Sequence, residues 1–207
     1  MKFLGGKTMP KIVNKAEKKE KLVQAAIPIF AKHGYRDTKM SDIAIAAEVG
    51  KGTLYEYFDS KDALFLGAFE LWFSTFVDQL EYTSSKDDNA YDTLINFFDQ
   101  YFQTIEEYVD IYYIYFDFWS EMTRNPNLNK NSISKEYQCL RDLIMNILEQ
   151  GTKQQIFQEM EHLSVSISLL AVAEGILVQW LFDQSVFLIR KVGLNSIKRI
   201  LDTYKNG

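Results

Sequence analysis

Apolar residues recur at helical spacing through the chain. From Leu22 they occupy positions 22, 25, 26, 29 and 30, which share one face of a helix. Gly34 predicts the end of this helix, because glycine accepts the left-handed conformation common at helix C-termini. Pro28 lies within it and is predicted to kink it at a cost of about 3 kcal/mol. Two short helices are predicted next, over residues 41–47 and 51–58.

Longer helices follow. Ser60 is a suitable N-cap for a helix whose apolar residues continue to Leu80, and Gly151 predicts the end of a later one. Further helices are predicted over residues 91–107, 110–122, 134–149 and 162–182, with a last one carrying Leu194, Ile197 and Leu201. No segment shows the alternation of a strand, so the predicted fold class is all-α.

The two short helices meet the geometric needs of a helix-turn-helix. One helix lies across the DNA backbone while the second enters a major groove about 12 Å wide. Ile43, Ala44 and Leu54 are small or apolar where the two helices must pack. Gly50 and Gly52 leave room for a phosphate at the start of the second helix.

Polar side chains on the second helix are candidates for DNA contact. They are Lys51, Thr53, Tyr55 and Tyr57, followed by Lys61 on the next helix. Tyr55 and Tyr57 could instead be ordinary core aromatics, but each has a hydroxyl to place, which favours phosphate contact. Leu54 and Phe58 are interpreted as internal anchors.

Charge is unevenly distributed. The chain carries a net −5, yet residues 1–61 sum to +5 and residues 62–207 to −10. A basic first third on an acidic body is expected when only one end meets DNA. The alternative is a solvated lysine tail, because lysines among the first 21 residues supply most of the surplus.

A family resemblance rests on residues 22–70. The segments that carry it are Phe30-Ala31-Lys32-His33-Gly34-Tyr35, Asp42-Ile43-Ala44, Val49-Gly50-Lys51-Gly52-Thr53-Leu54-Tyr55-Glu56-Tyr57-Phe58 and Ser60-Lys61-Asp62-Ala63-Leu64. They resemble the N-terminal domain of the tetracycline-repressor (TetR) family. The resemblance implies an all-α homodimer with an N-terminal helix-turn-helix domain and a C-terminal helical domain. That domain would bind a small molecule and thereby release DNA.

The resemblance also implies individual DNA contacts. Thr38, Lys39 and Ser41 would touch DNA from the second helix, and Lys51, Gly52, Thr53, Tyr55 and Tyr57 from the recognition helix, followed by Lys61. Three residues depart from the family pattern. Glu48 replaces the usual turn glycine, Gly50 replaces a common capping serine, and Glu56 can face either a cytosine or solvent.

We therefore predict three parts. Residues 1–20 form a flexible basic arm, residues 21–61 the helix-turn-helix DNA-binding domain, and residues 62–207 an effector-binding and dimerisation domain.

Aromatic residues crowd the middle of the chain. At helical spacing most aromatics are core, but this density of Tyr and Trp near acidic residues also suits a pocket for a flat or cationic ligand. The candidate pocket residues are Trp72, Phe76, Phe98, Tyr101, Phe102, Tyr112, Phe116, Trp119 and Glu174. The predicted effector is hydrophobic, aromatic or cationic.

Residues 163–182 could be mistaken for a membrane span. Glu174 near the middle argues against insertion at a cost of roughly 2.5–3.5 kcal/mol, and a helix apolar on every side is buried on every side. We predict that this helix and the last one form a dimer seam. The candidate dimer residues are Leu170, Leu177, Leu181, Ile197 and Leu201.

Other function classes find less support. The sequence contains neither a glycine-rich phosphate loop nor a nucleophile motif, which argues against an enzyme. The Glu-x-x-His spacing that begins at Glu159 would need a second copy to form a di-iron site, and there is none. A constitutive DNA-binding protein without an effector, and an activator, remain open. No cofactor or metal is predicted. The single Cys139 and the lack of a signal-like apolar run predict a cytoplasmic protein.

Overall fold

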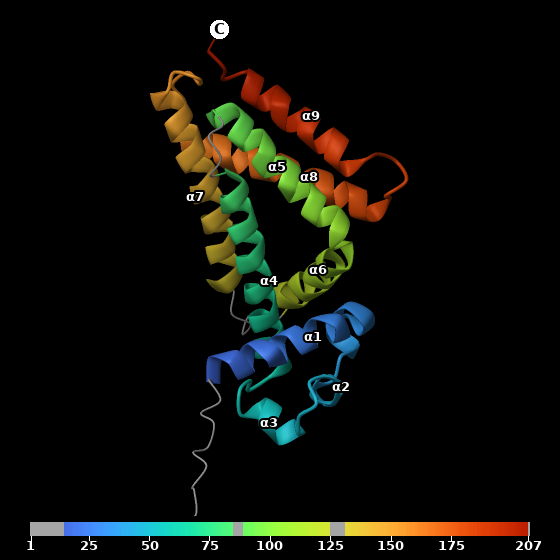
Figure 1. The fold of residues 1–207 in the computed structure, drawn as a ribbon. Helices are drawn as coiled ribbons and strands as arrows, with labels where there is room; N and C mark the ends of the chain where they lie inside the picture. Colours follow the sequence, from blue (N-terminus) through green and yellow to red (C-terminus); the bar gives the residue numbers. More distant parts are fainter. Residues whose placement is uncertain (1–14, 85–88, 125–130, 207) are drawn as a thin grey trace, which may run out of the picture. The chain divides into compact units, whose positions relative to one another are not determined.

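The computed structural model describes residues 15–84, 89–124 and 131–206, and the regular elements found there are all helices (Figure 1). The predicted all-α class is confirmed. The chain divides into two compact units, one ending at Ala68 and one beginning at Phe69. This division falls inside the fourth helix rather than before it, and each unit is described separately below.

The described part of the first unit, from residue 15 onward, contains three complete helices. They are α1 (Lys15–Asp37), α2 (Met40–Ala46) and α3 (Lys51–Tyr55), followed by the beginning of α4 (Lys61–Ser84). Helix α1 packs on α2, and α2 packs on α3. Of the predicted basic arm over residues 1–20, residues 1–14 lie outside the described part, and residues 15–20 already belong to α1.

A single break interrupts α1. Gly34 takes φ 73°, a left-handed value that suits glycine, so the predicted stop is a break followed by one more turn. Pro28 does not produce the predicted kink, because the non-helical backbone angles in α1 belong to Gly34. Pro28 is exposed, so water can hydrogen-bond the carbonyl that its missing N–H leaves without a partner.

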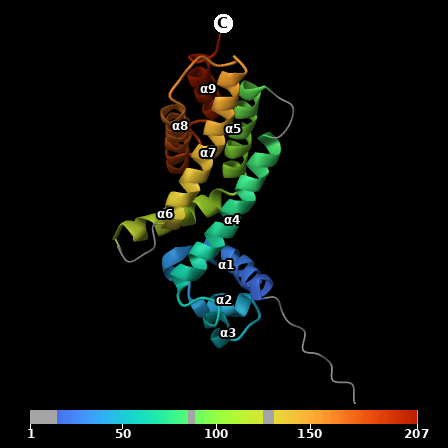
Figure 2. The ribbon, with the colours of Figure 1, turned by 90° about the vertical axis from the view of Figure 1, so that its left-hand side faces the viewer.

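The second unit, which we call the body, runs from Phe69 through the rest of α4. Its other helices are α5 (Ala90–Glu107), α6 (Val109–Arg124), α7 (Asn131–Lys153), α8 (His162–Phe182) and α9 (Ile189–Asp202). Helix α5 packs against α7 and α9, and α8 packs against the same two helices. Figure 2 shows α5 and α7 running alongside the later part of α4.

Two glycines allow helices of the body to approach closely. A Cβ atom at Gly193 of α9 would lie 2.3 Å from the Phe102 ring of α5. At Gly151 a Cβ would lie 2.4 Å from the Phe157 ring, and this residue lies within α7 rather than ending a helix as predicted. Close packing, not a left-handed turn, therefore explains Gly151.

Polar contacts also fasten α9 to α5. The Arg190 guanidinium pairs with both carboxylate oxygens of Asp99, and the Tyr91 hydroxyl donates to Asp202 over 2.8 Å. These contacts are exposed, so they fix geometry more than they add stability.

Helix α8 is, among the described residues, the one helix long and apolar enough to cross a membrane by length and composition alone. Its buried residues include Leu169, Ala173 and Trp180, and its partners are α7 and α9. This packing favours the predicted role of a core helix.

Candidate nucleic-acid interface and ligand cavity

The turn between α2 and α3 has the left-handed backbone that a glycine would favour. Glu48 takes φ 53°, and the Val49 amide donates to the Ala44 carbonyl over 3.0 Å. The departure from the family pattern at Glu48 thus preserves the turn at the cost of placing a side chain in a disfavoured conformation.

The predicted contact residues of α3 form an exposed polar surface. Lys51, Gly52 and Tyr55 are exposed, and Thr53 and Tyr57 are half-buried. The Lys51 ammonium lies 5.9 Å from the centre of the Tyr55 ring. A Cβ at Gly52 would meet no atom within 4 Å, so internal packing does not explain this glycine. The open space at Gly52 would admit an external group such as a phosphate.

The contacts predicted from α2 are only partly available. Lys39 is exposed and Ser41 is half-buried, with its hydroxyl donating to Asp42 over 3.3 Å. Thr38 is 2% exposed, and its hydroxyl donates to the Gly34 carbonyl over 2.6 Å. The predicted DNA contact through the Thr38 side chain is therefore wrong, because that hydroxyl closes the C-terminal end of α1.

Lys61 also has a structural role. Its ammonium donates to the carbonyls of Tyr35 and Arg36 over 2.7 and 2.9 Å and lies over the Tyr35 ring. A cation at the end of α1 is favoured by the helix dipole. Lys61 is therefore half-buried, and its ammonium is held within the unit.

Two further features complete this surface. Leu54 and Phe58 are buried, at 0% and 3% exposed, which confirms them as anchors. Ile45 on α2 is 76% exposed and was not singled out from the sequence. Its signal was its position in α2, turned away from the buried pair Ile43 and Ala44.

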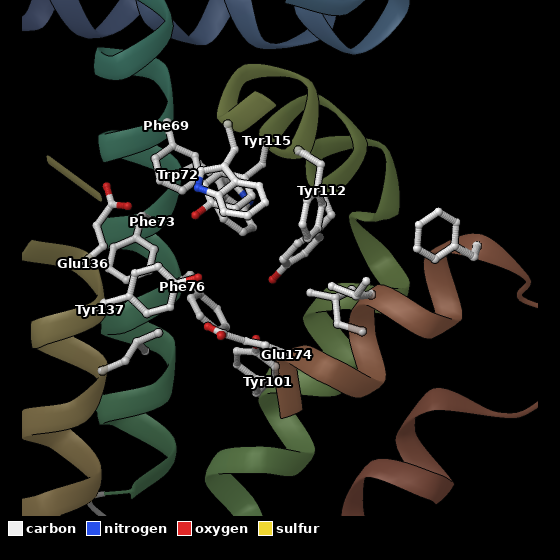
Figure 3. A pocket seen from close by; sticks show the side chains of 16 residues that line it. Phe69, Trp72, Phe73, Phe76, Tyr101, Tyr112, Tyr115, Glu136, Tyr137 and Glu174 are labelled. Atoms are coloured by element: carbon white, nitrogen blue, oxygen red, sulfur yellow. The ribbon is translucent and has the colours of Figure 1, made fainter. Parts of the chain in front are cut away.

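A cavity of about 510 Å³ lies within the body, a size typical of ligand sites (Figure 3). Five helices supply its lining. The lining residues are Phe69, Trp72, Phe73, Phe76, Tyr101, Tyr112, Tyr115, Phe116, Trp119, Glu136, Tyr137, Leu140, Glu174, Leu177, Val178 and Phe182. Trp119 and Phe182 are exposed, so the cavity meets solvent beside them.

Aromatic rings hold one another in this lining. The rings of Trp72 and Phe76 stack at 5.9 Å between centroids, and the Tyr112 ring stands edge-on to Trp72 at 5.4 Å. Phe69 stacks with Tyr115 at 4.8 Å. These contacts join α4 to α6 and orient ring faces that a cationic or flat ligand can use.

Most of the predicted pocket residues lie together around this cavity. Those that line it are Trp72, Phe76, Tyr101, Tyr112, Phe116, Trp119 and Glu174. Phe98 and Phe102 do not line it, because both are 0% exposed and fill the core, with Phe102 under Gly193. The sequence did not single out Glu136 or Tyr137, which approach from α7, because only the fold brings that helix to the aromatic cluster.

Two carboxyl groups lie in the lining. Burial, followed by repulsion from Glu70, raises the pKa of Glu136 to about 8. Within the described residues no group hydrogen-bonds its Oε1 atom, which is buried. Burial also raises the pKa of Glu174, although a hydrogen bond from Tyr137 and the nearby Arg141 act in the opposite direction.

The phenols of the lining stay protonated. Burial raises the pKa of Tyr115 to about 12 and that of Tyr101, Tyr112 and Tyr137 well above the ordinary value. Tyr137 hydrogen-bonds both Tyr115 and Glu174. The polar side-chain groups of the cavity are therefore neutral hydroxyls, the indole N–H groups of Trp72 and Trp119, and two carboxyls.

The predicted dimer residues mostly lie inside one chain. Leu170, Leu177, Ile197 and Leu201 are at most 4% exposed, and Leu181 is half-buried against the same core. They therefore belong to the core of the subunit and not to a face open to a second copy. The exposed residues of α8 are Leu163, Ser164, Ile167, Ser168, Ala171, Gly175, Gln179 and Phe182. All of them except the two serines form a stripe spaced about one turn apart.

The residues considered for enzymatic chemistry, His162 and Cys139, do not line the cavity. The His162 ring lies 3.1 Å from the Thr152 hydroxyl, and Cys139 is half-buried on α7. Over residues 15–84, 89–124 and 131–206, no three His, Cys, Asp or Glu side chains gather as they would around a metal ion.

Known proteins resemble the chain in both units. Residues 22–68 match the family model for bacterial regulatory proteins of the tetR family. IcaR of Staphylococcus epidermidis, the negative transcriptional regulator of the biofilm operon icaADBC, is 31% identical over 96 residues, 45% of this chain. Because the matched part is 51% of IcaR, the chain spans about half the length of this curated relative.

Solved structures extend the likeness over nearly the whole fold. A TetR transcription regulator from Haloarcula marismortui has a TM-score of 0.82 at 17% identity, over 92% of this chain and 100% of that chain. FadR from Bacillus subtilis, solved with stearoyl-CoA, has a TM-score of 0.71 at 16% identity, over 87% and 96%. At these identities the comparison shows a shared fold.

Proposed function

We propose that the chain is a member of the tetR family of bacterial regulatory proteins, and that it is a cytoplasmic transcriptional repressor released from its operator by a small hydrophobic or aromatic effector. The observation that carries the proposal is a mainly aromatic cavity of about 510 Å³ in a chain that also exposes Lys51 and Tyr55 on a short helix after a tight turn. A protein that only bound DNA would have no need of the cavity.

The DNA contacts are assigned to the exposed part of the α2–α3 surface. Lys51 supplies a cation, and the hydroxyls of Thr53, Tyr55 and Tyr57 supply donors to phosphate. Lys39 and Ser41 support them from α2, while Gly52 leaves space for the DNA backbone. The base preference stays open, because Glu48, Gly50 and Glu56 depart from the family pattern.

We assign dimerisation to the exposed stripe of α8. Leu163, Ile167 and Phe182 are 44%, 47% and 87% exposed, which is costly for large apolar side chains unless a partner covers them. Ala171 and Gly175 lie between them and let a second helix approach. Two recognition helices would then reach major grooves about 34–36 Å apart in a pseudo-palindromic operator.

Effector binding is expected to weaken this fit. A coupling of about 1–3 kcal/mol between the cavity and the DNA surface would lower operator affinity roughly 5- to 150-fold. FadR, a neighbour in fold, was solved in complex with stearoyl-CoA, which supports ligand binding by a protein of this fold.

The test is DNA binding measured by fluorescence anisotropy on a pseudo-palindrome from the DNA beside the protein's own gene. Lys51→Ala should weaken binding about tenfold and lower the salt dependence by about one phosphate contact, and Tyr55→Phe should weaken it less. Lys198 is exposed on α9, so Lys198→Ala is the matched control and should bind the DNA normally. Unaltered affinity in both α3 variants would show that the recognition surface lies elsewhere.

Two further outcomes separate the remaining candidates. Operator binding that no cavity ligand weakens would indicate a constitutive DNA-binding protein. Ala171→Glu should convert a dimer into a monomer in sedimentation experiments, because it introduces a charge into the α8 stripe. Continued dimerisation by this variant would exclude the stripe as the interface.

A further inference from the structure

Charge is one-sided in the cavity. Of the described residues that line it, two are acidic and none is Lys, Arg or His. The acids come from different helices, Glu136 from α7 and Glu174 from α8. In Figure 3 the Glu174 carboxyl points into the cavity, and Glu136 lies at the wall beside Phe69 and Phe73.

We propose that this cavity binds a lipophilic monocation, such as a phosphonium or quaternary ammonium ion with aromatic substituents, and that Glu136 and Glu174 supply its counter-charge. The inference rests on the proposed function in taking the cavity as the effector site, and it specifies the class of effector.

The groups around each acid support this assignment. Glu70 of α4 faces Glu136 and adds negative potential, while the neutral phenol of Tyr115 lies near it from α6. Around Glu174 lie the phenols of Tyr137 and Tyr101, together with Arg141. Arg141 is the nearby cation, and it is not among the cavity-lining residues.

The unpaired Oε1 atom of Glu136 indicates which partner is missing. A buried polar atom without a hydrogen bond costs roughly 1–3 kcal/mol, so such atoms are rare in folded proteins. A cation beside this carboxyl would meet that oxygen, and the ring faces of Trp72 and Phe76 would cover the rest of its surface. An anion in the same place would find no cationic lining residue to offset its lost hydration.

Binding of a permanent cation should also displace a proton. The raised pKa of Glu136, about 8, means that the carboxyl is largely protonated at pH 7 in the empty cavity. A cation favours the ionised form, so the proton leaves Glu136 for the solvent when the cation binds. The affinity for a permanent cation should therefore rise with pH, by up to tenfold per unit below pH 8.

The experiment compares tetraphenylphosphonium with tetraphenylborate, which has nearly the same shape and the opposite charge, and with neutral triphenylphosphine oxide. Isothermal titration calorimetry on the full chain should show tetraphenylphosphonium binding at least tenfold more tightly than either other probe. In buffers of different ionisation enthalpy, binding at pH 7 should release close to one proton.

Variants locate the charge effect. Glu136→Gln and Glu174→Gln should each weaken tetraphenylphosphonium binding about tenfold, and Glu136→Gln should also abolish proton release. Asp142→Asn removes an exposed charge from the same helix as Glu136, outside the cavity lining, and should bind normally. Thermal unfolding and circular dichroism establish that each variant is folded.

Several results would overturn the inference. They are absence of tetraphenylphosphonium binding, equal or tighter binding of tetraphenylborate, and unchanged affinity in both glutamine variants relative to Asp142→Asn. Because these titrations contain no DNA, their outcome does not depend on whether ligand binding releases the operator. A cation that binds the cavity without releasing the operator would refute the proposed control by an effector, but not the cation site. An anion that binds the cavity and releases the operator would refute the cation site, but not control by an effector.

Discussion

The unit that ends at Ala68 and the body that begins at Phe69 carry their chemistry in opposite ways. In the first, Lys51, Thr53 and Tyr55 lie within five residues of sequence, with Lys51 and Tyr55 exposed and Thr53 half-buried. In the body, the cavity residues come from five helices between Phe69 and Phe182 and, apart from Trp119 and Phe182, are buried or half-buried. A contiguous motif can be recognised from the sequence alone, whereas a cavity exists only after distant helices have packed.

The two units also differ in where they are vulnerable. The body depends on close contacts between helices, as at Gly193, and it contains a buried acid at Glu136. The first unit contains a disfavoured backbone conformation at Glu48. Three substitutions test this contrast, in order of decreasing effect.

The largest effect is expected from Gly193→Val. A Cβ atom there would lie 2.3 Å from the Phe102 ring, so α9 must move away from α5. Overpacking of this kind costs about 3 kcal/mol. Urea denaturation should show the loss, while Asn195→Val, at an exposed site on the same helix, should cost much less. Equal stability of the two variants would contradict the close α5–α9 packing.

The second effect depends on pH and concerns Glu136→Gln. Between about pH 4.5 and 8 the folded chain keeps a proton on Glu136 that the unfolded chain has released, so stability falls as the pH rises. Glutamine removes this decline. The variant should be more stable above pH 8 by on the order of 1 kcal/mol or more, which is a melting temperature roughly 2–4 °C higher per kcal/mol.

Below pH 4.5 the difference between Glu136→Gln and the natural chain should be small, because Glu136 is then largely protonated in both the folded and the unfolded state. Thermal melts at several pH values measure this dependence, with Asp142→Asn as the control on the same helix. Parallel stability curves for Glu136→Gln and the natural chain would mean that Glu136 is not a buried acid.

The smallest effect is expected from Glu48→Gly. The left-handed conformation costs a residue with a side chain about 1–2 kcal/mol, and part of the gain is offset by the greater freedom of glycine when unfolded. The net stabilisation should be up to about 1 kcal/mol. Glu56→Gly is the matched control. Glu56 has φ −67°, which suits a residue with a side chain, so glycine there should destabilise the folded chain instead. Destabilisation by both would indicate that the α2–α3 turn does not need a left-handed residue.

Helix positions were largely predictable because apolar periodicity determines them. Residues 162–182 were predicted as a helix and α8 has those bounds, and Ser60 caps α4 through the Ala63 amide over 3.1 Å. The beginning of α1 was missed, because its first turns are rich in lysine and lack an apolar face. Leu22 is where burial begins.

The faces of α8 were not predictable in the same way. An amphipathic helix reveals its buried side through its polar side, but α8 has apolar residues all round. Leu170 and Leu177 were assigned to a partner and lie in the core, while Ile167 and Phe182 are exposed. Only packing against α7 and α9 selects one side.

The candidate cavity was half predictable for a related reason. Tyr and Trp density located the α4–α6 wall, but Phe98 and Phe102 look like their neighbours in sequence and are core. The sequence around Glu136 does not indicate a cavity residue, because the aromatic side chains that surround Glu136 come from other helices. Thr38 shows the same limit in the first unit, since its hydroxyl was needed at the end of α1.

The placement of the tryptophans gives the molecule a built-in optical probe. All three tryptophans, Trp72, Trp119 and Trp180, lie in the body, and two of them line the cavity. Their fluorescence therefore reports on the body alone, because the first unit contains no tryptophan. A compound that enters the cavity should change this emission directly, without any dye attached to the protein. DNA alone should change the tryptophan emission only if its binding at α3 alters the conformation of the body.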